Sequence, residues 1–223
     1  MKERTKDLTP PYGRFLVRLT RPFPDFDFSF IKPVRQRAVE LLNLKPGDRV
    51  LDVGCGPGGS FPFLVDAVGP TGQVVGVEIS PDHSELARRR IARNRWKNVE
   101  VFVGAAQDVP LTGTYDGLVM FAAPDVYASE EALDNILPHL KDNARVAAFG
   151  AKLSINGLGR IFNPFLKTLC GLSFSTTPRP DYEPWRILAK YLEGIEVEEY
   201  CFGLMFLASG SVVTKNVQLK NHF

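Results

Sequence analysis

The chain has 223 residues, of which 44% are hydrophobic and 23% are charged, so its composition suits one globular domain and excludes a disordered chain. Its three cysteines, Cys55, Cys170 and Cys201, form no CxxC pair, which argues against a disulfide scaffold and against a zinc site. The net charge is only +2 and no run of 18 apolar residues occurs, so neither a strongly basic nucleic-acid binder nor a membrane-spanning protein is expected.

Strands and helices are expected to alternate from residue 34 to residue 150. In chain order the predicted elements are a helix after Pro33, strand 49–53, a helix ending near 68, strand 73–77, a helix from Pro81, strand 99–103, strand 115–122, helix 129–140 and strand 143–150. A last helix at 184–192 precedes two strands near 195–201 and 203–208, which must pair antiparallel because their connection is short.

This order predicts an α/β fold, namely a Rossmann-like, seven-stranded, mostly parallel sheet with helices on both faces and an antiparallel C-terminal strand. The helix after Ser80 is expected to turn Leu86, Ala87, Ile91 and Ala92 inward and a basic face outward. Residues 1–223 form a single domain in this interpretation. It comprises an N-terminal cap segment 1–32, a cofactor-binding core 34–150 and a substrate-covering insert 152–181 that breaks the alternation.

A glycine-rich loop at 54–59 lies between a predicted strand and a predicted helix, where parallel sheets bind their ligands. Asp52 precedes the loop, and Glu78 ends the next strand, where a carboxylate can accept both hydroxyls of a ribose. The glycines also satisfy GxGxxG, so an NAD(P)-dependent oxidoreductase is an alternative. Asp52 favours a cationic ligand because its charge would repel a pyrophosphate, and no Tyr-xxx-Lys pair is present.

The run Val50-Leu51-Asp52-Val53-Gly54-Cys55-Gly56-Pro57-Gly58 resembles motif I of the class I S-adenosylmethionine-dependent methyltransferases. The resemblance extends over 34–150 and includes Gly76 to Pro81, Gly104 to Pro110, Tyr115 to Val119, and Leu137 to Arg145. It is closest to small-molecule and lipid methyltransferases of the methyltransferase type 11 kind, for which S-adenosylmethionine is the methyl donor and S-adenosylhomocysteine the product.

The resemblance implies a set of cofactor-binding residues: Asp52, Gly54, Cys55, Gly56, Gly58, Glu78, Ile79, His83, Ala105, Ala106, Phe121 and Ala122. In this set Asp52 would orient the amine, Glu78 would hold the ribose, Ile79 would pack on the adenine, and Ala106 would offer its backbone N–H to the adenine ring. The chain departs from its relatives at Gly104-Ala105-Ala106-Gln107, which lacks the usual acidic partner of the adenine amino group. Either Asp108 substitutes for that partner, or the adenine is held mostly by packing.

Simpler alternatives exist for three of these residues. Asp52 could cap backbone N–H groups of its own loop, Glu78 could be a surface acid at a strand end, and His83 could be a surface residue in the first turn of a helix. A protein that binds the cofactor without catalysis is a further alternative to an enzyme.

The methyl acceptor is expected beside the loop after strand 115–122, where Asp125 and Tyr127 are the candidate catalytic side chains. Helix capping by Asp125 and simple packing by Tyr127 are the alternatives. Segments 10–32 and 152–181 combine Phe with Arg or Lys, which indicates a small hydrophobic acceptor, lipid-like or quinone-like, and a peripheral membrane contact. No metal and no nucleic acid are expected, a cytoplasmic monomer and a cytoplasmic homodimer both remain open, and the acceptor atom is not predicted.

Overall fold

The computed structural model describes residues 31–173 and 182–213. Residues 1–30 of the predicted cap segment 1–32 lie outside the described residues, as do 174–181 of the predicted insert. Its elements are α2 (Lys32–Leu41), β1 (Arg49–Val53), α3 (Phe61–Val68), β2 (Gln73–Glu78), α4 (Pro81–Asn94), β3 (Val99–Val103), β4 (Tyr115–Phe121), α5 (Pro124–Tyr127), α6 (Glu130–Ile136), η2 (Leu137–His139), β5 (Leu140–Ala151), α7 (Gly157–Ser173), η3 (Leu188–Tyr191), β6 (Leu192–Tyr200) and β7 (Met205–Val212).

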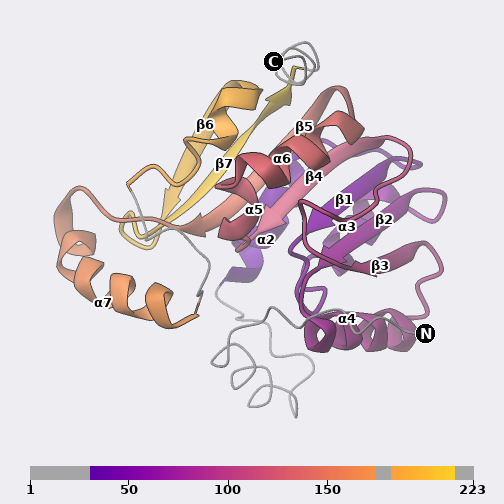
Figure 1. Ribbon diagram of the computed structural model, residues 1–223, viewed down its shortest axis with the longest axis horizontal. Helices are drawn as coiled ribbons and strands as arrows, with labels where there is room; N and C mark the ends of the chain where they lie inside the picture. The colour runs from indigo at the N-terminus through magenta and orange to yellow at the C-terminus, as the bar shows by residue number, and fades with distance from the viewer. Residues whose placement is uncertain (1–30, 174–181, 214–223) are drawn as a thin grey trace.

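Seven strands form one sheet in the order β3-β2-β1-β4-β5-β7-β6 (Figure 1). Strands β1 to β5 pair in parallel, and β7 runs antiparallel between β5 and β6. The chain order reverses between β1 and β4, which is the switch point where open α/β sheets bind ligands. The predicted fold class is confirmed, including the antiparallel C-terminal strand.

Helices cover both faces of this sheet, as predicted. One core contains Val34 of α2, Phe61 and Leu64 of α3 and Ala87 of α4, packed on β1, β2, β4 and β5. The second core, on the opposite face, contains residues of α5, α6 and η3 with Leu51, Leu118 and Phe206 among the strand residues beneath them. The strands between the two cores are apolar on both sides because parallel strands covered by helices meet no water.

Helix α4 departs from its predicted inner face. Ala92 is exposed, whereas Arg90 is buried and its Nη1 donates to the carbonyl oxygen of Gly58 at 2.8 Å. The buried guanidinium has this backbone acceptor, which offsets part of its cost of burial. The prediction that the basic residues of this helix all face outward is therefore wrong at Arg90.

The C-terminal third also differs from the predicted elements. Instead of a helix at 184–192 there is a turn and the short 3₁₀ helix η3, because Leu192 already belongs to β6. Strand β5 begins at Leu140, where the predicted helix 129–140 was expected to continue. Residues 157–173 form α7, a helix that was not predicted because Gly157, Gly159 and Pro164 are unfavourable in helices.

Candidate functional site

The candidate site lies where the carboxyl ends of β1, β2 and β4 meet. The backbone N–H groups of Gly54 and Cys55 both donate to the carbonyl oxygen of Val77, at 2.8 and 3.1 Å, so the glycine loop is fixed against the end of β2. Asp52 pairs with Gly76 on one side and with Val119 on the other, in the middle of the sheet. The topology thus brings the loop and both predicted carboxylates to one edge.

Three of the four glycines in the loop have positive φ, 74° at Gly54, 55° at Gly56 and 78° at Gly58, but their surroundings differ. A Cβ added at Gly54 would lie 2.5 Å from the Cβ of Ala123, and one at Gly58 would lie 2.5 Å from the ring of Phe61. A Cβ at Gly56 would meet no atom within 4 Å. Gly54 and Gly58 are therefore needed for packing, whereas the backbone of Gly56 is open to an approaching ligand.

Glu78 is buried and fixed by two backbone N–H groups. Its Oε2 accepts from the N–H of Gly56 at 2.8 Å, and its Oε1 accepts from the N–H of Ser80 at 2.8 Å. The alternative of a surface acid is excluded by this burial. Each oxygen of a carboxylate can accept more than one hydrogen bond, so both retain capacity for the hydroxyl groups of a ligand.

Two predicted adenosine contacts lie beside Glu78. Ile79 is 42% exposed. The Nδ1 of His83 lies 3.9 Å from Oε1 of Glu78, and the ring is partly exposed. Both side chains are thus placed to contact a ligand held by Glu78. His83 also donates its backbone N–H to the Oγ of Ser80, the N-cap of α4, at 3.4 Å.

Asp52 is completely buried, and neither of its carboxylate oxygens has a hydrogen-bond partner among the described residues. It does not cap its own loop, which excludes that alternative. Burial raises the pKa of Asp52 to about 7; the charge of Arg35 and the hydroxyl of Ser60 lower it, and the charge of Glu78 raises it. A buried carboxylate without a hydrogen bond is costly, so this residue suits a cationic ligand that would pair with it.

Arg35, which the sequence reasoning missed, reaches this site from α2. Its Nη1 donates to the Oγ of Ser60 at 3.0 Å, and its Cζ lies 4.0 Å from the centroid of the Phe121 ring. Phe121 in turn stacks on Phe149, with 4.3 Å between ring centroids. Nothing in the spacing of α2 distinguishes Arg35 from its exposed neighbours, so only the tertiary structure reveals it.

The side chain of Cys55 faces the sheet. A Cβ built on Gly76 would lie 3.0 Å from its Sγ, and burial, together with the charges of Asp52 and Glu78, raises the pKa of this thiol well above its usual range. The thiol is therefore neutral and acts in packing. Only the backbone of Cys55 is part of the ligand-facing loop.

The turn after β4 carries the remaining cofactor predictions. Ala122 is exposed and has a φ of 59°, and its N–H donates to the carbonyl oxygen of Phe149 at 2.8 Å. Positive φ is uncommon for a residue with a Cβ and often marks a functional turn. Phe121, beside it, is buried.

Ala105 and Ala106 are partly buried after β3. The side chain of Asn135 on α6 donates to the carbonyl oxygens of Ala106 and Val109, at 2.8 and 3.1 Å, and so fixes this turn. Asn135 was not singled out from the sequence. The predicted substitute acid, Asp108, is exposed.

The two candidate catalytic side chains lie in different environments. Asp125 is exposed in the first turn of α5, whereas Tyr127 is 1% exposed and packs edge-on against Phe206, with 5.6 Å between ring centroids. A Cβ at Gly150 would lie against the hydroxyl of Tyr127. The position of Tyr127 favours the packing alternative, and a catalytic role for either residue stays a prediction.

Among the described residues, no group of three or more His, Cys, Asp or Glu side chains could hold a metal ion. In the same part of the chain, no helix combines the length and the hydropathy needed to cross a membrane.

Comparison with known proteins identifies the segment that carries this site. Residues 50–143 match the family model described as "Methyltransferase domain". This segment is therefore similar to methyltransferase domains. The chain is 36% identical over 110 residues to a demethylmenaquinone methyltransferase of Symbiobacterium thermophilum, which covers 48% of this chain and 44% of that protein. It is 37% identical over 86 residues to a protein-L-isoaspartate O-methyltransferase of Ignicoccus hospitalis, covering 38% of this chain and 41% of that protein.

The matches thus span less than half the length of these relatives. Solved structures match the fold over more of the chain. A SAM-dependent methyltransferase from Aquifex aeolicus superposes with a TM-score of 0.54 at 20% identity, covering 85% of this chain and 100% of that chain. The geranyl diphosphate C-methyltransferase of Streptomyces coelicolor A3(2) gives a TM-score of 0.65 at 15% identity, covering 81% and 79%. The predicted resemblance to class I S-adenosylmethionine-dependent methyltransferases is confirmed.

Proposed function

We propose that this chain catalyses S-adenosylmethionine-dependent transfer of a methyl group to a small, hydrophobic acceptor. The observation that carries the proposal is the pair of buried carboxylates around the open backbone of Gly56. Asp52 lacks a hydrogen-bond partner among the described residues. Glu78 is fixed by two backbone N–H groups, and its oxygens can each accept a further hydrogen bond. A nucleoside with a cationic amino-acid tail satisfies both, and the match to methyltransferase domains spans the same residues.

Each of these residues would contact a different part of the cofactor. Asp52 would pair with the ammonium group, Gly56 would present its backbone to the methionine part, and Glu78 would accept from the ribose hydroxyls. Ile79 and His83 would flank the adenosine, and Ala105 and Ala106 would border the adenine. When bound, S-adenosylmethionine supplies a methyl group on a sulfonium, which a nucleophile displaces directly.

What the protein adds to such a displacement is alignment and exclusion of water. Holding reactants in a near-attack geometry can supply roughly 7–11 kcal/mol of barrier reduction. The turn at Phe121 and Ala122 follows β4, next to the glycine loop in the sheet order, and would border the reacting methyl. Asp125, exposed at the start of α5, is the side chain there that could orient an acceptor or take its proton.

The acceptor class rests on two observations. The relatives include demethylmenaquinone methyltransferases, whose name indicates a quinone-like substrate. The segment after β5 also exposes several large apolar side chains.

A second candidate comes from the protein-L-isoaspartate O-methyltransferases among the relatives, which would make the acceptor a protein carboxylate. A non-catalytic cofactor-binding protein is the remaining alternative, and an oxidoreductase is disfavoured because Asp52 would repel a pyrophosphate.

Transfer of a labelled methyl group tests these alternatives. We expect S-adenosylhomocysteine to form with phenolic or quinol acceptors or with phospholipids, and not with an isoaspartyl peptide. If only the isoaspartyl peptide is labelled, the acceptor is a protein carboxylate and not a small hydrophobic molecule. Cofactor binding without transfer to any acceptor would favour the non-catalytic alternative, and tight binding of NADH would contradict the proposal. A cytoplasmic location and the oligomeric state stay predictions.

A further inference from the structure

Helix α7 is attached to the rest of the molecule through polar and small residues. The side chain of Asn163 accepts from the backbone N–H of Ser154 and donates to the carbonyl oxygen of Ser154, both at 2.9 Å. Gly159 is buried so closely against the carbonyl of Phe202 and the hydroxyl of Ser154 that a Cβ would collide with both. Residues 159 and 163 are one turn apart, so they define the inner face of α7.

The outer face of α7 is apolar. Leu158, Ile161, Phe162 and Phe165 follow a spacing of three and four residues, which places them on one stripe of the helix. Each is between 51% and 72% exposed. Ile155, three residues before Leu158, is 57% exposed. We call these five residues the α7 patch.

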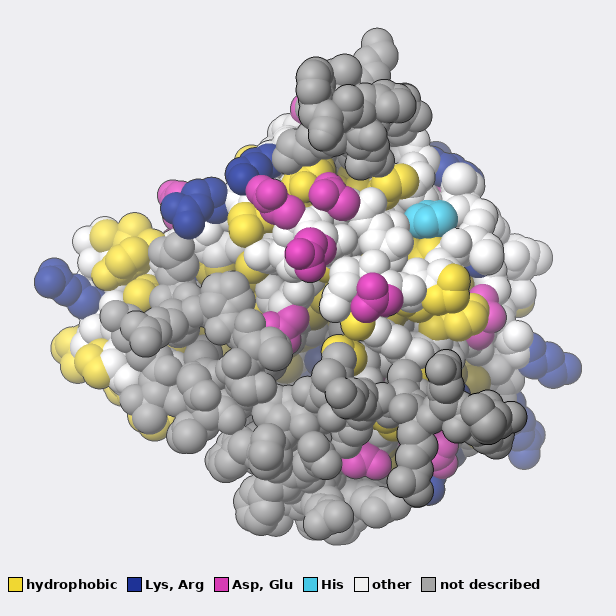
Figure 2. All heavy atoms as spheres, in the orientation of Figure 1, with side chains coloured by type: hydrophobic (Ala, Val, Ile, Leu, Met, Phe, Trp, Pro, Cys, Tyr) yellow, Lys and Arg dark blue, Asp and Glu magenta, His cyan; other side chains and the backbone are white. Residues whose placement is uncertain are grey.

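This arrangement is the reverse of an ordinary surface helix, which turns its apolar stripe inward and its polar residues to water. Figure 2 shows hydrophobic side chains at the left edge of the molecule, where Figure 1 places α7, with a basic side chain beside them. A contiguous exposed patch of this kind marks an interaction surface in a folded protein.

Charge distinguishes between the partners that an apolar patch could have. Residues 151–173 contain no Asp or Glu, and their charged residues are Lys152, Arg160 and Lys167. Arg160 is exposed on a flank of α7 outside the stripe, because two residues turn a helix by about 200°. Lys152 is buried and paired with Glu199 of β6 at 2.5 Å. In a symmetric dimer the patch would face itself, and segment 151–173 of neither copy would offer an acidic residue to the basic residues of the other. An anionic surface matches both the apolar stripe and the basic residues of this segment.

We propose that α7 docks on the surface of an anionic phospholipid membrane. The helix has 17 residues, fewer than the approximately 20 needed to span a bilayer, so it would lie in the interface with the α7 patch among the acyl chains and Arg160 near the phosphates. It follows β5, whose carboxyl end lies at the same edge of the parallel sheet as the glycine loop. Docking would thus turn the candidate site toward the lipid, where a hydrophobic acceptor is concentrated.

Vesicle flotation tests this inference without cofactor or acceptor, so it is independent of the proposed function. The full chain is mixed with vesicles of phosphatidylcholine alone or of phosphatidylcholine with phosphatidylglycerol. We expect flotation with the anionic vesicles, weaker flotation with the neutral ones, and a loss of at least about tenfold in binding for Phe162→Ser/Phe165→Ser. Arg160→Glu should weaken binding to the anionic vesicles more than to the neutral ones.

Phe102→Ser on β3 is the matched control, since Phe102 is also an exposed phenylalanine but lies outside the patch, and it should float as the parent does. Circular dichroism checks that each variant is folded; if the double variant is not, Ile161→Ser replaces it with a smaller expected loss. The proposal is overturned if the parent binds neither type of vesicle, if the variants bind equally well, or if light scattering shows a patch-dependent dimer that ignores vesicles.

Discussion

The two ends of the sheet edge that carries the candidate site are built in opposite ways. At β1 and β2 the acidic side chains are buried. Glu78 is fixed by backbone N–H groups, whereas the carboxylate of Asp52 has no hydrogen-bond partner among the described residues. After β5, polar residues such as Asn163 are turned toward the protein, and apolar ones such as Phe162 are exposed. The first end suits the polar, cationic ligand that we propose, and the second suits the apolar surface that we propose.

The largest effect is expected within the glycine loop, where packing and binding can be separated. Gly54→Ala should destabilise the protein by about 2–4 kcal/mol, because the new Cβ adds steric overlap with Ala123 to the strain of a positive φ. Gly56→Ala should cost about 1 kcal/mol through strain alone, yet weaken S-adenosylmethionine binding by at least about tenfold.

Urea unfolding and calorimetric titration of both variants provide the check. Equal destabilisation by the two substitutions, or full cofactor affinity in Gly56→Ala, would contradict the assignment of separate roles to the two glycines.

Asp52 should make the free protein less stable as the pH rises. Its pKa is raised from 3.8 to about 7 on folding, so between these values the folded state binds more protons than the unfolded state, and stability falls with increasing pH. Asp52→Asn removes this dependence. The stability of the variant relative to the parent should therefore increase by on the order of 4 kcal/mol between about pH 4 and about pH 8.

Chemical denaturation across this pH range measures the difference directly. A relative stability that stays constant with pH would show that Asp52 is not a desolvated, unpartnered acid in the free protein.

At the other end, Asn163→Ala should loosen α7 without affecting the cofactor region. The substitution removes both hydrogen bonds to the backbone of Ser154, each worth about 1 kcal/mol, so amides of α7 should exchange faster by about thirtyfold. Asn156→Ala, at an exposed asparagine in the same connection, is the control. Hydrogen exchange that also rises at β1 and β2 would mean that the two ends are coupled.

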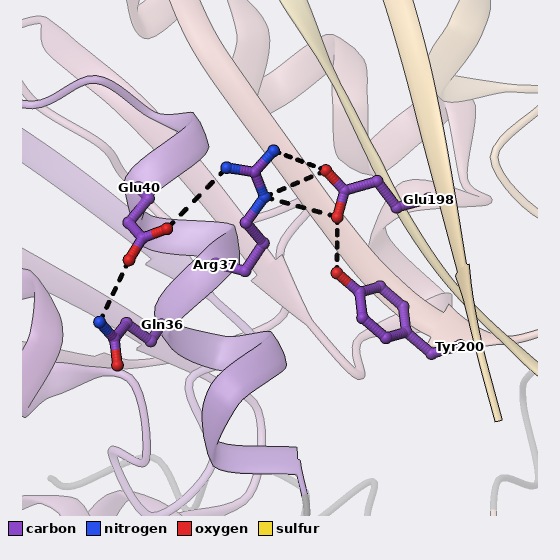
Figure 3. A network of polar contacts seen from close by, with 5 residues as sticks. All are labelled: Gln36, Arg37, Glu40, Glu198 and Tyr200. Atoms are coloured by element: carbon purple, nitrogen blue, oxygen red, sulfur yellow. Dashed lines mark hydrogen bonds and ion pairs between the residues drawn. The ribbon is translucent and has the colours of Figure 1, made fainter.

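The smallest effect is expected in the network of Figure 3, which joins α2 to β6 at the edge of the sheet. Arg37 on α2 donates to Glu198 on β6 at 2.7 Å, and the hydroxyl of Tyr200 donates to the same carboxylate at 2.5 Å. The Arg37 and Tyr200 hydrogen bonds lower the pKa of Glu198, while burial and Glu198 raise the pKa of Tyr200 to about 12. Because Arg37 and Glu198 are both substantially exposed, Arg37→Ala should leave the Tm unchanged within error. A drop of several degrees would show that this surface network holds α2 to the sheet.

The cofactor end could be predicted from the sequence because its signals are local. Strands Arg49–Val53 and Val99–Val103 have the predicted bounds, since each is a short apolar run between turn residues. Glu78 and Asp52 follow from their positions at strand ends. Arg35 and Arg90 could not be found, because sequence spacing does not show which basic residue of a helix meets a carbonyl or a ring in another element.

The C-terminal end was predicted less well, because its structure depends on contacts between residues far apart in the sequence. The stripe of α7 has helical spacing, but Gly157, Gly159 and Pro164 conceal it, and the polar contacts that orient the helix involve Ser154 and Phe202. Tyr127 illustrates the problem at a single residue, since its place in the core is set by Phe206, far along the chain.

Calorimetric titration of S-adenosylmethionine into the parent chain and Glu78→Ala tests the central claim most directly. The account predicts binding of S-adenosylmethionine and S-adenosylhomocysteine but not NADH by the parent, and a loss of at least about tenfold in Glu78→Ala, because hydroxyl groups lose a fixed charged acceptor. Glu85→Ala, at an exposed acid on α4, should bind as the parent does. No binding by the folded parent, or equal affinity in Glu78→Ala, would contradict the account.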